Sequence, residues 1–222
     1  MITLSKTLDP ADFAELQPEL ATVDRHFHSA SPQHPMRRWE YAMALHALMT
    51  LEKTEVPDRL VDVGGAGSPF ALMAEARGYI VHLVDPMASY QKERVSKCTL
   101  AGYLTCLPRL AQVVTCISVL EHIEDLEEFY YHLSCLVAPG GLLFLTMDYC
   151  DGFALAKEDF RVPDTYDLHW MRERIFNNFT LGQLVTQFYR RDFVLLGEVD
   201  YAWHGPQVSD YTFASLALVK RA

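Results

Sequence analysis

The sequence predicts an α/β fold in which a mostly parallel sheet is covered by helices on both faces. Beyond an N-terminal helical region, short apolar runs alternate with segments of helical periodicity, the pattern of parallel strands joined by crossover helices. Residues 142–147 form an apolar run, which is typical of a strand buried on both faces. Two further runs, 193–201 and 211–219, flank a loop with Gly205 and Pro206 and predict an antiparallel pair at one side of the sheet.

Two amphipathic helices are expected ahead of the first strand. In residues 10–27 the apolar side chains recur at helical spacing, and residues 36–51 form a second such segment after the proline-containing break at 31–35. We assign residues 1–55 to an N-terminal helical cap and residues 56–222 to the main domain, both within a single compact unit.

The remaining elements follow from the apolar runs and from the residues that end them. Strands are expected at residues 59–63, 79–84, 99–104, 113–119 and 142–147. Helices are expected at residues 69–77, 88–97 and 126–137. A last helix is expected to begin near Thr180, whose hydroxyl is a candidate N-cap.

Composition and charge argue against two classes of partner. The formal net charge of -10 means that the average surface repels phosphate backbones, and the basic residues form no long run, so nucleic acid is an unlikely partner. No apolar stretch approaches the roughly 20 residues of a membrane helix. Acidic residues stand where a signal peptide would have an apolar core. We therefore expect a cytoplasmic protein that does not enter a membrane.

The five cysteines predict buried free thiols. Their number is odd, none stands in a C-x-x-C pair, and most lie inside apolar runs. A zinc site would need paired ligands at short spacing, and the sequence shows no such pair, so no metal is expected.

The first predicted strand ends in a glycine cluster, Asp62-Val63-Gly64-Gly65-Ala66-Gly67, which would place bare backbone beside a ligand. A phosphate-binding P-loop would need Lys-Ser or Lys-Thr after the glycines, and neither follows. A dinucleotide fingerprint would need G-x-G-x-x-G, which no glycine here starts, so a nicotinamide-dependent oxidoreductase is disfavoured.

Two carboxylates near this cluster favour a different cofactor. Asp62 would repel a pyrophosphate, but it suits the cationic amino group of an amino-acid cofactor that carries a sulfonium. Asp85, at the end of the second predicted strand, is placed where a carboxylate can accept both ribose hydroxyls.

Four segments between residues 59 and 149 carry a family resemblance. They are Leu60-Val61-Asp62-Val63-Gly64-Gly65-Ala66-Gly67, His82-Leu83-Val84-Asp85, Val113-Val114-Thr115-Cys116-Ile117-Ser118-Val119-Leu120-Glu121-His122-Ile123 and Ala138-Pro139-Gly140-Gly141-Leu142-Leu143-Phe144. Together they resemble the class I S-adenosylmethionine-dependent methyltransferases of small-molecule type. The resemblance implies a Rossmann-like three-layer sandwich with a mostly parallel seven-stranded sheet and a C-terminal antiparallel strand pair. It also implies S-adenosyl-L-methionine as the cofactor and a small-molecule acceptor substrate as the partner.

By resemblance, cofactor-binding residues are expected in the glycine turn, at the ends of the following strands and beside the adenine. They are Asp62, Gly64, Gly65, Ala66, Asp85, Pro86, Thr105, Ile117, Ser118, Val119 and His122. The chain departs from the family pattern at Ala66 and Ser68, where glycine is usual, and at Thr105, where many relatives have an acidic residue.

No fixed catalytic residue is required for methyl transfer, because the sulfonium already activates the methyl carbon and positioning supplies much of the acceleration. If the acceptor must lose a proton, the candidate bases are His122, His169, Tyr149 and Asp148. The candidate substrate contacts are Trp39, Tyr41, Asp148, Tyr149 and Arg172, although Trp39 also fits buried packing.

The favoured function is transfer of a methyl group to a small or medium polar acceptor, by O- or N-methylation. The alternative, motivated by Ala66 and Ser68, is a regulatory or interaction module that binds S-adenosylmethionine without transferring its methyl group. A homodimer is kept as a possible assembly.

Overall fold

The computed structural model describes residues 3–26, 37–51, 58–65, 68–88, 94–106, 110–150, 160–161, 172–173, 176–202 and 212–222, with 160–161 and 172–173 as backbone only. The strands are β1 Ser5–Lys6, β2 Arg59–Val63, β3 Ile80–Val84, β4 Val95–Ser96, β5 Ala111–Ile117, β6 Val137–Tyr149, β7 Phe160–Arg161, β8 Arg172–Glu173, β9 Phe193–Leu195, β10 Val199–Asp200 and β11 Thr212–Lys220. The helices are α1 Asp12–Glu15, α2 Gln17–His26, α3 Arg37–Met49, α4 Phe70–Glu75, α5 Leu100–Cys106, the 3-10 turn η1 Leu120–His122, α6 Leu126–Leu136 and α7 Asn178–Tyr189.

The central sheet has seven strands in the order β4-β3-β2-β5-β6-β11-β9. The five strands from β4 to β6 pair in parallel, and β11 runs antiparallel to both β6 and β9. The predicted α/β class, the mostly parallel sheet and the antiparallel strands at one side are therefore confirmed. The carboxyl ends of β2, β3 and β5 lie side by side, which is where open α/β sheets bind ligands.

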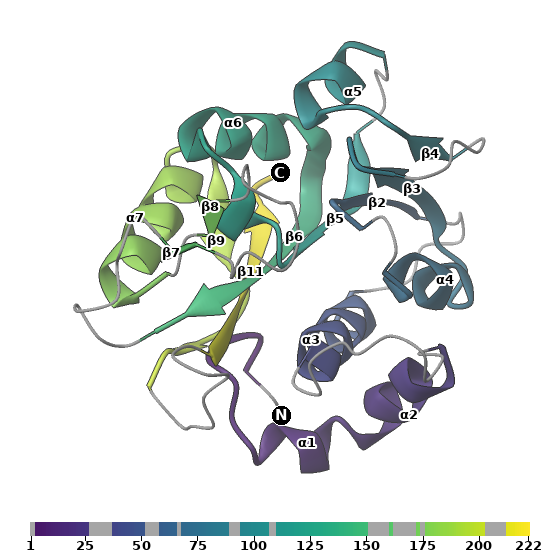
Figure 1. Ribbon diagram of the computed structural model, residues 1–222, viewed down its shortest axis with the longest axis vertical. Coiled ribbons are helices and arrows are strands. Elements are labelled where there is room, and N and C mark those ends of the chain that lie inside the picture. Colours follow the sequence, from purple (N-terminus) through teal and green to yellow (C-terminus); the bar gives the residue numbers. More distant parts are fainter. Residues whose placement is uncertain are drawn as a thin grey trace.

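Helices cover both faces of this sheet, as Figure 1 shows. On one face α2, α3 and α4 enclose a core that includes Trp39, Phe70 and Phe144. On the other face α5, α6 and α7 enclose a core that includes Tyr130 and Phe188. The central strand β6 is buried on both sides along residues 141–149, as its apolar run predicts.

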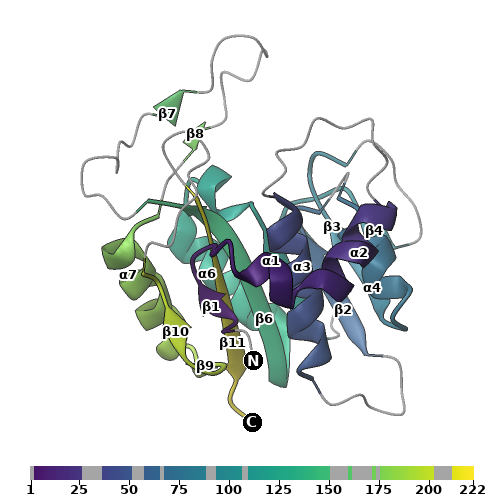
Figure 2. The ribbon, with the colours of Figure 1, turned by 90° about the horizontal axis from the view of Figure 1, so that it is seen from below.

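The N-terminal segment shares its core with the sheet. Figure 2 shows α3 lying across the sheet and β1 beside β10. In α3 the side chains of Trp39, Met43 and Leu45 are fully buried. Residues 37–49, which we expected to belong to a helical cap, therefore form part of one layer of the sandwich.

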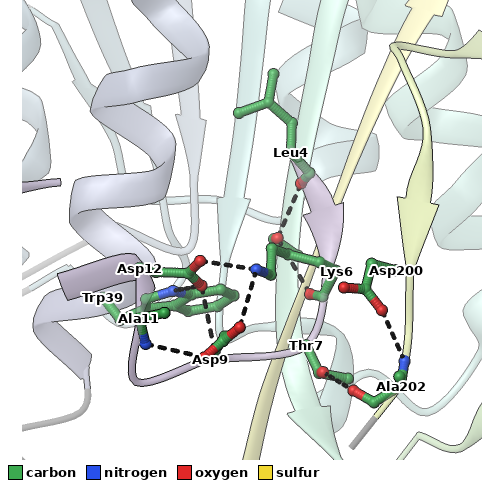
Figure 3. A network of polar contacts seen from close by, with 10 residues as sticks. Leu4, Lys6, Thr7, Asp9, Ala11, Asp12, Trp39, Asp200 and Ala202 are labelled. Carbon is green, nitrogen blue, oxygen red and sulfur yellow. Dashed lines mark hydrogen bonds and ion pairs between the residues drawn. The ribbon is translucent and has the colours of Figure 1, made fainter. Parts of the chain in front are cut away.

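A buried ion pair connects the start of this segment to α3 (Figure 3). The Lys6 ammonium lies 2.7 Å from Asp12 Oδ1, and the Trp39 indole N–H donates to Asp12 Oδ2 over 2.9 Å. Lys6 and Asp12 are both buried. Because each charge is paired and Asp12 also accepts from a neutral donor, the pair is tolerated inside the fold.

Two expected elements differ in the structure. The third strand, expected at 99–104, is wrong: this stretch lies in α5, and β4 is the strand that pairs with β3. Leu100 and Tyr103 are buried three residues apart, which is helical spacing. The expected helix 10–27 is divided into α1 and α2, because Pro18 has no N–H for a continuous helix.

Two local expectations need correction. The N-cap of α7 is Asn177, whose side chain accepts from the N–H of Thr180, and Thr180 is the third helical position of this capping box. The expected strand 193–201 is two strands, separated by Gly197 at a φ of 82°, and its second part pairs with β1.

The cysteines and helix lengths bear on two further expectations. All five cysteines are free thiols; Cys116 and Cys150 are buried, whereas Cys106 is exposed, so burial was wrongly expected for Cys106. Over the described part of the chain, no helix is long and apolar enough to cross a membrane.

Candidate functional site

A cavity of about 710 Å³ opens at the carboxyl ends of β2, β3 and β5. Six residues predicted to bind cofactor line it: Gly64, Asp85, Pro86, Ser118, Val119 and His122. Another cavity, of about 760 Å³, lies between α6 and α7 and contains none of the predicted site residues. The first cavity is therefore the candidate site.

The glycine turn after β2 is shaped by close contacts that leave no room for side chains. Gly64 has a φ of 79°, and a Cβ on it would lie 2.3 Å from Cγ2 of Val119. A Cβ on Gly65 would lie 1.9 Å from Oδ2 of Asp62. Both glycines are thus required by the turn itself, and Ala66 lies outside the described residues.

Asp62 is buried beneath this turn. Its Oδ1 accepts a hydrogen bond of 2.8 Å from the hydroxyl of Thr115 on β5. Its Oδ2 has no hydrogen-bond partner among the described residues. Burial raises the pKa of Asp62 to about 7, and the charge of Asp85 adds to the rise, while the Thr115 hydrogen bond opposes it.

Asp85 and Pro86 form the wall at the end of β3. Asp85 Oδ1 accepts from the backbone N–H of Met87 over 2.7 Å, which fixes the turn after the strand. Thr105 is exposed on α5, where its hydroxyl donates to the carbonyl of Gly102, and it does not line the cavity.

The cavity wall near α5 and α6 was missed by sequence reasoning. It is formed by residues at the start of α5 and along α6, namely Thr99, Leu100, Ala101, Glu128, Phe129 and His132. The helical spacing of Leu100 and Tyr103 was the signal that could have placed the start of α5 here.

The turn after β5 is held by a residue from the N-terminal helix α3. Ser118 has a φ of 50°, a conformation that is uncommon for a residue with a side chain. Its hydroxyl donates to Glu40 Oε1 over 2.6 Å, and the hydroxyl of Thr146 on β6 donates to the same oxygen over 2.5 Å. Ile117, one residue earlier, packs against the core under α3 and does not line the cavity.

Acidic side chains gather on the α3 side of these strand ends. Glu40, Glu121 and Asp148 are all buried, and the guanidinium of Arg37 interacts electrostatically with each of them. Arg37 Nη1 lies 3.9 Å from Glu40 Oε2, and its guanidinium carbon lies 5.7 Å from the centre of the Phe213 ring. Burial is the largest cause that raises the pKa of Glu40 and of Glu121, and Asp148 adds to the rise at Glu121.

His122 follows Glu121 in η1. It lines the cavity, and its Nδ1 has no hydrogen-bond partner among the residues that the structure describes. Burial lowers the pKa of His122, and Arg37 lowers it further. Its imidazole is therefore poised to be neutral and able to accept a proton.

Three of the proposed substrate contacts lie in the core, and one of them, Tyr149, is also a proposed base. Trp39 is fully buried and donates to Asp12, which leaves no surface for a substrate. Tyr149 is fully buried on the α7 side and donates to the carbonyl of Tyr201, so it offers a substrate no surface either. Tyr41 is also buried, close to Ser68, and burial raises its pKa to about 12.

The structure places Asp148 among the acidic side chains at the end of β6. His169 lies outside the described residues, and Arg172 is described only as backbone within β8.

Comparisons with known proteins agree with this fold. A family model described as a methyltransferase domain matches residues 33–197. The solved 1,6-didemethyltoxoflavin-N1-methyltransferase of Burkholderia thailandensis is 18% identical with a TM-score of 0.57, covering 97% of this chain and 92% of that chain. The N-methyltransferase NodS of Bradyrhizobium japonicum is 12% identical with a TM-score of 0.56, covering 86% and 100%. No curated protein matches the chain in sequence.

A third solved structure, an S-adenosylmethionine-dependent methyltransferase of Clostridium acetobutylicum, is 11% identical with a TM-score of 0.56 and covers 95% of this chain and 100% of that chain. The sheet order, the glycine turn and the family match together define a class I S-adenosylmethionine-dependent methyltransferase. The chain belongs to the methyltransferase domain family, and it is an enzyme.

Proposed function

We propose that this enzyme transfers the methyl group of S-adenosylmethionine to an oxygen or nitrogen atom of a small or medium-sized polar acceptor. The observation that carries the proposal is the buried Oδ2 of Asp62, an acceptor without a described partner beneath a glycine turn that leaves the backbone bare. A cationic amino group would supply the missing donor.

The residues around the cavity fit the parts of this cofactor. Asp62 would pair with its ammonium group, and the backbone of Gly64 and Gly65 would lie along its amino-acid chain. Asp85 would accept from its ribose hydroxyls, with Pro86 beside it. Ser118, Val119 and His122 would form the wall next to its sulfonium.

When bound, the cofactor would supply an electrophilic methyl carbon attached to a positively charged sulfur. The protein's own residues then have two tasks. The turn held by Glu40 and Ser118 fixes one wall against which the acceptor is aligned. His122, whose lowered pKa keeps its imidazole neutral, can take a proton from an acceptor hydroxyl at the edge of the cavity.

The acceptor class is supported by the size of the site and by similar structures. The cavity of about 710 Å³ is within the usual range for small-molecule sites, which run from roughly 300 to 1,000 Å³. Two of the similar structures are N-methyltransferases by their descriptions.

The test is calorimetric titration of the purified chain with S-adenosylhomocysteine, followed by detection of methylated products from a panel of hydroxyl and amine acceptors. We expect saturable binding with one molecule per chain. Absence of binding at millimolar S-adenosylhomocysteine would overturn the proposal.

A further inference from the structure

Three buried acidic side chains lie close to residues that line the cavity, although they do not line it themselves. Among the described residues they comprise Glu40 from α3, Glu121 from η1 and Asp148 from β6, with Arg37 as their shared cation. Glu40 has a structural task, because its Oε1 accepts from both Ser118 and Thr146. Glu121 has no comparable task.

Glu121 is 1% exposed, and neither of its carboxylate oxygens accepts a hydrogen bond from another described residue. Leaving a buried carboxyl group without partners costs free energy, because the water that would solvate it is lost and nothing replaces it. In its ionised form the carboxylate has only acceptor sites, so a partner that stabilises this form is a donor. A donor that also carries positive charge would compensate the neighbouring carboxyl groups.

We propose that Glu121, with Asp148 and Glu40 around it, binds the protonated amine of the methyl acceptor, and that the acceptor is a small aliphatic amine. This inference rests on the proposed function and narrows its acceptor class. The ammonium would donate to the carboxylate of Glu121. The positive charge of Arg37 compensates these carboxyl groups only in part, since three of them face that single guanidinium.

Other occupants fit these residues less well. A neutral hydroxyl group would donate one hydrogen bond and leave the surplus negative charge uncompensated. Among the described residues no group of three or more ligands is arranged to hold a metal ion. The adjacent Arg37 would also repel a divalent ion more strongly than a monovalent ammonium.

The position of Glu121 suits an acceptor that meets the cofactor. Its neighbour in η1, His122, lines the cavity, and Ser118, two residues before that turn begins, both lines the cavity and contacts Glu40. The backbone of β8 packs beside η1. An amine held by Glu121 would therefore lie next to the wall formed by Ser118 and His122.

The bound ammonium must lose one proton before its nitrogen has a lone pair. That proton would pass from the ammonium nitrogen to an oxygen of Glu121, which leaves a neutral amine and a neutral carboxylic acid. Burial and the charge of Asp148 raise the pKa of Glu121. The difference between its pKa and that of the amine becomes smaller, so Glu121 becomes a better proton acceptor. The groups that face Glu121 are Asp148 on β6, Cys116 on β5, and Glu40 and Arg37 on α3.

The experiment is calorimetric titration of the chain, saturated with S-adenosylhomocysteine, with matched probes. The probes are ethylammonium and 2-phenylethylammonium, compared with ethanol and 2-phenylethanol. We expect at least one ammonium ion to bind ten or more times more tightly than its alcohol, a ratio that equals about 1.4 kcal/mol. Glu121→Gln should abolish the preference while keeping the affinity for S-adenosylhomocysteine.

Glu19→Gln is the matched control. Glu19 is a buried glutamate on α2 that also has one oxygen without a described partner, and it is not among the carboxyl groups that interact with Arg37. This variant should retain the preference for ammonium. If Glu121→Gln does not fold, Asp148→Asn should reduce the preference in the same titration.

The proposal is overturned if no ammonium ion binds more tightly than its alcohol, or if Glu121→Gln keeps the wild-type preference. Failure of S-adenosylhomocysteine to bind would instead overturn the proposed function, and the first titration detects it before any acceptor probe is added.

Discussion

The hydroxyl of Ser118 donates to Oε1 of Glu40 over 2.6 Å, across a separation of 78 residues in the chain. This bond joins the N-terminal helix α3 to the turn that ends β5. Ser118 also lines the cavity. Glu40, which lies outside every recognised motif, therefore holds part of the candidate site in shape.

We predict that Glu40→Ala destabilises the protein and weakens S-adenosylhomocysteine binding about tenfold or more. The substitution leaves Ser118, Thr146 and the partly buried Arg37 without their partner, which should cost about 3 kcal/mol in the free energy of unfolding. Glu40→Gln keeps an oxygen for both hydroxyls and should lose less in both measurements. Equal losses in urea unfolding and calorimetry for the two variants would contradict this account.

Gly65→Ala should lower the affinity for S-adenosylhomocysteine at least tenfold, because the new Cβ would lie 1.9 Å from Asp62 Oδ2 and must displace the carboxylate or the turn. Gly182→Ala is the control. It lies within α7 with open space where its Cβ would stand, and alanine should stabilise the helix by about 0.5–1 kcal/mol. Calorimetry and thermal unfolding measure both effects, and wild-type affinity in Gly65→Ala would contradict the prediction.

The affinity for S-adenosylhomocysteine should depend on pH through Asp62. Burial raises the pKa of Asp62 to about 7, whereas an ammonium group of the ligand favours the ionised form. Binding must therefore release a proton below that pKa. The affinity should fall as the pH is lowered from 8 to 5.5, by at most about tenfold per pH unit. Asp62→Asn should bind S-adenosylhomocysteine more weakly, with an affinity that varies little with pH. If the affinities of the variant and of wild type changed with pH in parallel, the pairing of Asp62 with the ligand's ammonium group would be refuted.

The free energy of unfolding of the unliganded protein should also depend on pH through Asp62. In contrast to the affinity, it should fall as the pH rises. The carboxyl of Asp62 is favoured in its neutral form when folded, because its pKa is raised from 3.8. That contribution is complete below the unfolded pKa and is lost as the pH rises through about 7. In thermal unfolding, wild type should lose stability relative to Asp62→Asn as the pH rises from 4 to 8. A constant difference between the two proteins would contradict it.

Lys6→Met should destabilise the protein by about 3 kcal/mol, because it leaves the buried carboxylate of Asp12 without its cation. The exposed Lys97 provides the control, and Lys97→Met should change the free energy of unfolding by less than about 0.5 kcal/mol. Urea unfolding distinguishes them. If Lys6→Met matched this control, the ion pair would contribute nothing measurable.

The parts of the site that local sequence determines were predictable. The strand 59–63, the glycine turn and Asp85 were expected where the structure has them, because a buried parallel strand and its turn leave a strong local pattern. The strand β4 left no such pattern, because it has only two residues. The helix α5 was mistaken for a strand because short apolar runs fit both periodicities.

Other parts of the site depend on contacts between distant segments. Nothing in the local sequence distinguishes Glu40 from the other charged residues of a surface helix, and its role appears only when α3 packs against the ends of β5 and β6. Buried packing was expected for Trp39 from the sequence, but its indole hydrogen bond to Asp12 was not. For Glu121, the motif identified the surrounding residues. Only the folded structure shows that its carboxylate oxygens lack a hydrogen-bond partner among the described residues.

The pairing of β1 with residues near the other end of the sequence has a consequence for assembly on the ribosome. The backbone N–H of Ala217 donates to the Ser5 hydroxyl over 3.0 Å, across 212 residues, and α3 packs against β11. In a growing chain, the glycine turn is therefore synthesised long before α3, the helix that carries Glu40, can pack against β11. We expect a nascent chain in which β11 has not yet left the ribosome to be unable to retain its methyl donor, even though nearly every residue that we propose to contact the donor has already been made.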